Sequence, residues 1–146
     1  MNNTINDKAP VKSKNKIDIA AAAEVVWDKL ADISNWPAWQ KGVTHTVVYG
    51  EIKEGTRFDW KAGGLSFKSQ IHTSIREKEF GWTGKILGAS AVHNWYFEEK
   101  ENKTIVTIEE SLQGILPSLF TRYFQKILDS GIIKNLEELK EAVEGK

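Results

Sequence analysis

Apolar residues recur at every second position through the middle of this chain, from Val43 to Leu112. A period of two is typical of β-strands, whose successive side chains point to opposite faces. Short turn-forming links such as Gly63-Gly64 separate the runs, whereas parallel strands need crossovers of about a dozen residues or more. The pattern therefore predicts an antiparallel meander. Its strands are predicted over residues 44–49, 56–62, 65–76, 80–87, 91–99 and 104–112.

The C-terminal segment has a helical period. From Pro117 to Val143 apolar residues are spaced by three and four positions, which places them on one face of a helix about 40 Å long. Pro117 suits a first helical turn, and Gly145 suits a helix end. So wide an apolar stripe needs a broad partner, and we expect the inner face of the sheet to supply it. The stripe consists of Leu116, Leu119, Phe120, Tyr123, Phe124, Ile127, Leu128, Ile132, Leu136, Leu139 and Val143.

The N-terminal residues divide into a polar leader and a first strand. Residues 1–10 have little to bury and are predicted to be disordered, and residues 11–146 are predicted to form a single domain. Alternation over residues 11–19 predicts a strand that raises the total to about seven. Four lysines in this region raise the alternative of a basic arm, but the balanced charge of the chain favours a solvated leader. They are Lys8, Lys12, Lys14 and Lys16.

Two short helices are predicted between the first and second strands. Helical spacing extends over residues 20–33, and a second helix runs through Trp39, capped by Ser34 or Asn35, with Pro37 in its first turn. Trp36 and Trp39 are three positions apart and fall on one side of that helix. We expect these rings to fill the seam between the short helices and the sheet, although contact with a ligand is the alternative.

Composition restricts the class of protein. The chain has 146 residues, and its Lys and Arg residues equal its Asp and Glu residues at 20 each, so no overall field favours nucleic acid. It has no Cys, which excludes disulfides and thiolate sites, and no apolar run long enough to span a membrane. No signal peptide is visible, so a cytoplasmic location is expected. Six Trp residues form either a large core or the lining of an apolar pocket.

Alternation assigns a face to most strand residues. Every second residue of a strand is predicted to face inward. The inward set includes Leu65, Thr73, Ile75, Phe80, Ile86, Ala91, Phe97, Val106, Ile108 and Leu112. The predicted outward set, which is mostly polar, is Arg57, Asp59, Lys61, Lys68, Gln70, His72, Arg76, Thr83, Lys85, Asn94 and Glu98. In the strand 44–49, the neighbours Val47 and Val48 point to opposite faces, so the pattern does not decide which of its faces points inward.

The inward face carries polar and small residues that a dry core has no use for. His93 and Glu110 share it with the large rings, and Ser69 and Gly84 leave space beside them. Space with a few convergent polar groups inside an aromatic shell is typical of a ligand pocket. The alternative is that the small residues admit the helix closely and that Glu110 lies at a wet rim.

Several segments of the chain carry a resemblance to a known family. They are Asn35-Trp36-Pro37-Ala38-Trp39, Gly55-Thr56-Arg57-Phe58-Asp59-Trp60, Trp82-Thr83-Gly84, His93-Asn94-Trp95-Tyr96-Phe97, Thr104-Ile105-Val106-Thr107-Ile108-Glu109-Glu110-Ser111 and Gly114. With the predicted order of strands and helices, they resemble the START-like helix-grip superfamily (SRPBCC), and in particular its polyketide cyclase/dehydrase and lipid-transport-like branch. The resemblance spans essentially residues 11–143 and marks architecture more than chemistry. It implies an α+β helix-grip fold, with a seven-stranded curved antiparallel sheet wrapped around the long C-terminal helix.

The same resemblance implies an apolar cavity between the sheet and the helix that holds a lipid, a polyketide or an isoprenoid-like molecule. We expect this cavity near the first half of the helix, where the aromatic residues concentrate. Its predicted lining is Phe58, Trp60, Phe67, Ser69, Ile71, Trp82, Gly84, His93, Trp95, Glu110, Phe120, Tyr123 and Phe124.

Three functional readings stay open. The favoured reading is a carrier or sensor of a small hydrophobic ligand, without cofactor or metal, since the three His residues lie far apart. The second is an enzyme of cyclase, dehydratase or isomerase type, with His93 and Glu110 as candidate catalytic groups. The third is a chaperone-assisting interaction module. No nucleophile elbow or nucleotide-binding motif is present, and a monomer or a weak dimer is expected.

Overall fold

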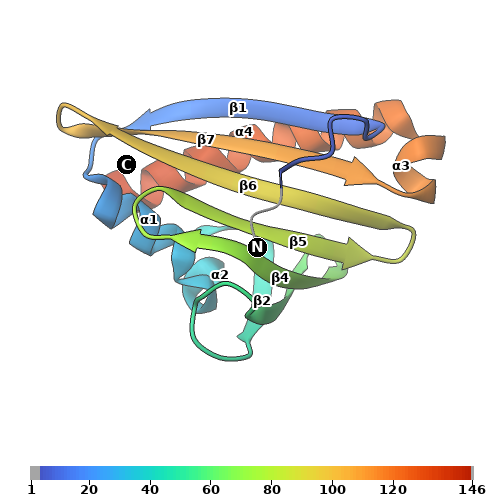
Figure 1. Cartoon of the computed structure of the whole chain (residues 1–146), viewed down its shortest axis with the longest axis horizontal. Coiled ribbons are helices and arrows are strands. Elements are labelled where there is room, and N and C mark those ends of the chain that lie inside the picture. Colours follow the sequence, from blue (N-terminus) through green and yellow to red (C-terminus); the bar gives the residue numbers. More distant parts are fainter. Residues whose placement is uncertain (1–3, 146) are drawn as a thin grey trace.

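The computed structural model describes residues 4–145 and contains one seven-stranded sheet in the order β1-β7-β6-β5-β4-β3-β2 (Figure 1). Every neighbouring pair of strands is antiparallel, as the period of two predicts. The fold is therefore the α+β helix-grip architecture. The strands are β1 Val11–Ile19, β2 Val43–Val48, β3 Arg57–Ala62, β4 Leu65–Ile75, β5 Glu79–Ile86, β6 Ala89–Lys100 and β7 Lys103–Gln113.

The C-terminal helical region has a break that the sequence pattern did not reveal. A short helix, α3 (Ile115–Leu119), is followed at Phe120 by a non-helical residue with φ −121° and ψ 50°, and α4 (Thr121–Glu144) begins after it. The prediction of one helix from Pro117 onward is therefore wrong at its start. The end is as expected, because Gly145 adopts a left-handed conformation and its N–H bonds to Glu141 O at 2.8 Å.

The helix predicted over residues 20–33 is also interrupted. Helix α1 spans Ala23–Ala31, and a 3₁₀ turn, η1 (Ile33–Asn35), leads directly into α2 (Trp36–Trp39). Asp32, with ψ 69°, separates α1 from η1. Asn35, one of the two predicted caps, occupies the N-cap position of α2, but its side chain makes no capping hydrogen bond. Pro37 lies in the first turn, as predicted.

Helix α4 lies along β1 and crosses the concave face of the sheet (Figure 1). Gln125 Nε2 donates to Lys12 O at 2.8 Å near one end of β1, and Lys140 Nζ donates to Asp18 O at 2.6 Å near the other. The buried stripe that meets the core is Leu128, Ile132, Leu136 and Leu139. The sheet is therefore the apolar partner of the second half of the predicted stripe. In the first half the prediction is wrong for Leu119, Phe120, Tyr123 and Ile127, which are exposed.

Trp36 fills the seam between α2 and the sheet. Its ring is buried and lies 5.7 Å from the rings of Phe58 and Trp60 and 5.2 Å from that of Trp82. Its Nε1 donates to Leu30 O at 2.8 Å, so the one polar atom of the ring is satisfied. Trp39 is half-buried and packs against the same core.

Because of a β-bulge in β4, the prediction of which residues face inward is wrong for part of this strand. Ile71 pairs with Trp82 but Thr73 pairs with Gly81, so one extra residue, His72, is inserted. After the bulge the alternation of inward and outward residues in β4 is shifted by one position, so Thr73 and Ile75 point to the outer face. Ile75, predicted to face inward, is 48% exposed as a result.

The bulge also explains why His72 and Asn94, both predicted as solvated, are buried. The His72 ring lies against Gly81, whose missing side chain makes room: a Cβ there would approach His72 Cε1 to 2.6 Å and Asn94 Oδ1 to 2.5 Å. His72 Nε2 hydrogen-bonds Asn94 Oδ1 at 2.7 Å, and His72 Nδ1 hydrogen-bonds Thr73 Oγ1 at 2.7 Å. Burial lowers the pKa of His72 below its ordinary value.

The pairing of β2 with β3 determines which face of β2 points inward. In β2, Thr46 pairs with Trp60 and Val48 with Phe58, so Val48 faces the core and Val47 faces outward.

The predicted leader lies partly outside the described residues, at 1–3. In its described part, Asn6 N–H donates to Ser111 Oγ at 3.1 Å, which places this segment against β7.

Candidate functional site

The concave face of the sheet is filled at one end and open at the other. Along each central strand, the inward residues at the end where α4 begins are half-exposed, and those further along are buried. In β6, for example, Ala91 is half-exposed, whereas Trp95 and Phe97 are buried. The partly exposed inward residues toward the open end include Trp60, Phe67, Gly84, Ile86, Ala91 and Leu112, and Glu110, whose side chain is 13% exposed, lies beside them.

Helix α4 shows the same gradient. Phe124 is half-exposed at its start, whereas Leu128, Ile132 and Leu136 further along are buried. Gly131 has no atom within 4 Å of the position that a Cβ would occupy, so its side of the helix borders open space. The sheet and the helix therefore diverge toward the end at which α4 begins.

His93 and Glu110 lie at the boundary between the open and the filled parts. They are directly paired residues of β6 and β7, and His93 Nδ1 contacts Glu110 Oε1. The imidazole is stacked on Trp82, with centroids 4.5 Å apart and planes 10° apart, and Trp95 lies on a nearly parallel plane 5.7 Å away. This arrangement holds the ring in one orientation.

Two buried nitrogen atoms of this cluster have no hydrogen-bond partner among the described residues: His93 Nε2 and Trp95 Nε1. Trp39 Nε1, elsewhere on the core, is a third. A buried polar group without a partner costs about 1–3 kcal/mol. In the neutral tautomer whose Nδ1–H donates to Glu110, His93 Nε2 is an acceptor, and the Trp95 indole N–H is a donor. The two nitrogen atoms therefore offer one acceptor and one donor.

The structure brings some of the predicted lining residues together and separates others. Phe58, Ile71, Trp82 and Trp95 are fully packed in the core, and Ser69, also buried, accepts from Trp60 Nε1 at 3.0 Å. Trp60, Phe67, Gly84, Glu110 and Phe124 border the open end. Phe120 and Tyr123 are largely exposed on the helix surface and lie apart from the buried cluster.

The alternation pattern did not reveal one polar cluster, because it predicts that His72 and Asn94 are solvated, whereas both are buried. It lies on the outer face, where Asn94 Nδ2 also reaches Tyr96 OH at 3.4 Å. Burial and the neighbouring Glu109 carboxylate raise the pKa of Tyr96. Gly81, in the interior of β5, was the available signal, because a strand glycine often marks close approach by another group.

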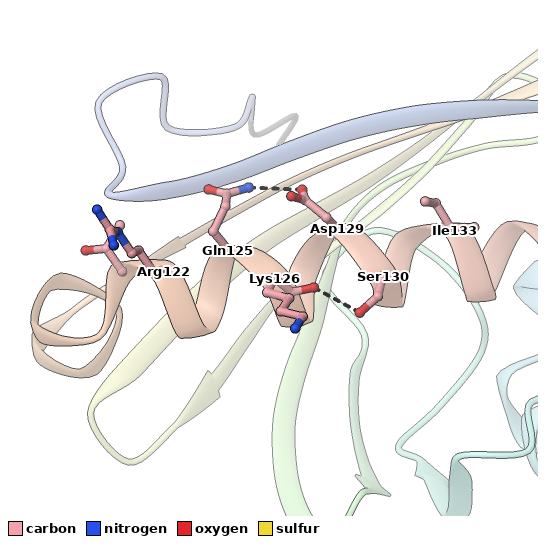
Figure 2. Close-up of a pocket in the computed structure, with 7 residues that line it drawn as sticks. Arg122, Gln125, Lys126, Asp129, Ser130 and Ile133 are labelled. Carbon is pink, nitrogen blue, oxygen red and sulfur yellow. Dashed lines mark hydrogen bonds between the residues drawn. The ribbon is translucent and has the colours of Figure 1, made fainter.

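A shallow groove of about 580 Å³ lies on another side of α4 (Figure 2). Two hydrogen bonds join residues of its lining: Gln125 Nε2 donates to Asp129 Oδ1 at 3.0 Å, and Ser130 Oγ donates to Lys126 O at 2.9 Å. None of the predicted lining residues borders it, so it is separate from the concave site. Its lining is Thr121, Arg122, Gln125, Lys126, Asp129, Ser130 and Ile133.

Within residues 4–145, no cluster of three or more His, Cys, Asp or Glu residues has a metal-binding arrangement. In that same part of the chain, no helix is long and apolar enough to cross a membrane.

Solved structures with the same fold span the whole domain. A hypothetical protein, jhp0584, from Helicobacter pylori superposes with a TM-score of 0.83 at 17% identity over 98% of each chain. A START superfamily protein from Mycobacterium smegmatis superposes with a TM-score of 0.80 at 11% identity, covering 92% of this chain and 97% of the other. The di-domain ARO/CYC StfQ from the steffimycin biosynthetic pathway gives 0.78 at 15% identity, and 51% of that longer chain is covered.

Sequence comparison gives the family. No curated protein matches the chain in sequence. The family model described as polyketide cyclase / dehydrase and lipid transport matches residues 10–144, which is nearly the whole chain. With the helix-grip sheet and helix already established, the chain belongs to the polyketide cyclase/dehydrase and lipid transport family.

Proposed function

We propose that this protein binds a small hydrophobic molecule, of lipid, polyketide or isoprenoid type, between the concave face of the sheet and the first half of α4, as a carrier or sensor. The observation that carries the proposal is the buried, unpartnered Nε2 of His93 beside an open apolar surface. A ligand that fills this space would bury apolar area and supply the missing hydrogen bond.

The position of the polar groups defines how the ligand lies. Ala91 is two residues before His93 on the same face of β6 and is half-exposed, so the apolar body of the ligand lies over Ala91 and Phe124. The polar end points inward to His93 Nε2. Glu110, fixed against Nδ1, orients the imidazole for that contact. The family description, which includes lipid transport, supports this class of ligand.

A ligand carried through purification would test the proposal directly. Native mass spectrometry followed by organic extraction is expected to find an apolar molecule that carries a hydroxyl or carbonyl group. Ligands should also quench tryptophan fluorescence and raise the melting temperature, as mass action requires. A preparation that is reproducibly empty and unresponsive to lipid, polyketide and isoprenoid ligands would contradict the proposal.

Two neighbouring positions provide a matched control. Ala91→Phe places a ring in the concave space and is expected to abolish binding, whereas Val92→Phe places it on the opposite face of β6 and should leave binding unchanged. Thermal unfolding of both variants shows whether the domain is intact. Equal binding by folded Ala91→Phe protein would place the ligand elsewhere.

A second candidate function is proton transfer by the same pair. A carboxylate that orients one nitrogen of an imidazole and leaves the other facing a ligand is an arrangement of general acid–base catalysis, which contributes about 10²–10⁴-fold. Single-turnover conversion and ligand affinity, measured together for His93→Ala and Glu110→Gln, separate the two functions. Conversion lost with affinity retained would establish the enzyme, and affinity lost without turnover in any variant would establish the carrier.

A further inference from the structure

Large apolar side chains are exposed together at one end of the molecule. The tip of the β5–β6 turn, Leu87, is 96% exposed, and Ile115 and Leu119 of α3 are 71% and 70% exposed. The turn and the helix are joined, because Leu116 N–H donates to Gly88 O at 3.1 Å, and Figure 1 shows them at the right-hand end. Further exposed apolar residues there are Leu65, Phe120, Tyr123 and Ile127.

The charges around this apolar surface are mainly positive. Three segments form the end, residues 61–68, 85–92 and 113–128, and none contains Asp or Glu. They meet in the fold because Lys68 pairs with Lys85 and Ser90 pairs with Gln113. The leader adds Lys8 and also one acid, Asp7. The exposed cations of the three segments are Lys61, Lys68, Lys85, Arg122 and Lys126.

This concentration is not a property of the whole surface. The chain as a whole has equal numbers of acidic and basic residues, so its acids lie elsewhere. The same end is also where the concave face is open, with Trp60 and Phe124 half-exposed. An apolar, cationic surface therefore surrounds the mouth of the space between the sheet and α4.

We propose that this end, formed by the β3–β4 turn, the β5–β6 turn, α3 and the start of α4, docks on the surface of a bilayer that contains anionic lipids. Apolar side chains that insert among the acyl chains, with cations at the level of the headgroups, are the two features of interfacial membrane binding. Tyr123 is suited to the headgroup boundary, and Phe120 to the apolar side of the interface. The docked protein would present its open concave space to the membrane.

A second copy of the chain fits this surface less well. A two-fold interface brings the same patch of both subunits together, and here it would oppose cations to cations with no acid in the three segments. The exposed apolar residues stand on separate turn tips and a helix end, and they do not line a groove. The anionic bilayer complements both the charge and this arrangement.

Sedimentation with vesicles tests the inference and needs no ligand. The protein is expected to bind vesicles of equal phosphatidylcholine and phosphatidylserine, to ignore phosphatidylcholine alone, and to lose binding at high salt through screening. The double variant Leu87→Ser/Phe120→Ser should weaken binding about tenfold or more, because it removes inserted apolar area. Ile75→Ser, at the opposite end of β4, is the matched control and should bind as the wild type does.

Several results would overturn the inference. They are the absence of binding to the mixed vesicles at low salt, equal binding to phosphatidylcholine alone, or full binding by folded Leu87→Ser/Phe120→Ser protein. A dimer in sedimentation velocity that these substitutions dissociate, with no vesicle binding, would assign the surface to a second copy. The outcome is independent of the proposed ligand site, because Ala91→Phe fills the concave space and leaves the outer apolar side chains in place.

Discussion

His93 and Glu110 are directly paired across β6 and β7, and the carboxylate contacts Nδ1 of an imidazole that is stacked on Trp82. The contact selects the nitrogen that carries the proton, so Nε2 is an acceptor when the ring is neutral.

The first prediction concerns this tautomer. Long-range ¹⁵N–¹H NMR spectra, recorded above the ordinary titration range of imidazole, should show the His93 proton on Nδ1. Glu110→Leu removes the acceptor, and we expect the Nε2–H form to become populated together with a loss of about 1–3 kcal/mol of stability. Glu109→Leu is the control, since Glu109 pairs with Lys14 at 3.2 Å on the other face. An unchanged tautomer in Glu110→Leu protein would contradict the assigned role.

The second prediction concerns the glycine under His72. Gly81→Ala should destabilise the fold by about 1–3 kcal/mol, because a Cβ would lie 2.5 Å from Asn94 Oδ1 and force the cluster apart. Gly131→Ala, with no atom within 4 Å of its Cβ, is the comparison. As a helix-interior substitution it should raise stability by about 1 kcal/mol. Urea denaturation measures both, and a neutral effect of Gly81→Ala would show that the bulge is adaptable.

The third prediction is a dependence of stability on pH. Burial lowers the pKa of His72 in the folded state below its ordinary value of 6.5. Above pH 6.5 both states are neutral at this residue, so it has no effect on stability. As the pH falls below 6.5, His72 binds a proton in the unfolded state but not in the folded state, so the free energy of unfolding decreases. The decrease ends when the pH reaches the lowered pKa of His72 in the folded state. The difference between the urea midpoints of wild-type and His72→Gln protein should change over this interval only.

The fourth prediction tests the helix that the sheet grips. Leu136 is buried in the core, and Leu136→Ala should cost about 2–5 kcal/mol through lost burial and a residual cavity. Ile133, on the same helix but 43% exposed, should cost much less when changed to Ala. Equal losses for the two substitutions in thermal and urea unfolding would be inconsistent with the observed packing of α4.

Local patterns in the sequence were sufficient for the architecture. The period of two from Val43 to Leu112 predicted the antiparallel meander, and the three-and-four spacing predicted the helix whose residues Leu128, Ile132 and Leu136 are buried. The pairing of His93 with Glu110 also followed from strand order and parity. Each of these depends on the spacing of residues along one strand or helix, or on the order of short turns.

Features that depend on contacts between segments distant in the sequence were determined only by the tertiary structure. The bulge at His72 exists because Gly81, on the next strand, leaves room for the ring, and it moved Ile75 to the outer face. The break at Phe120 follows α3, which the β5–β6 turn holds through Gly88 O. Which inward residues are open and which are packed depends on how α4 diverges from the sheet. Periodicity records the direction of a side chain, but the space that it meets is set by the packing of distant segments.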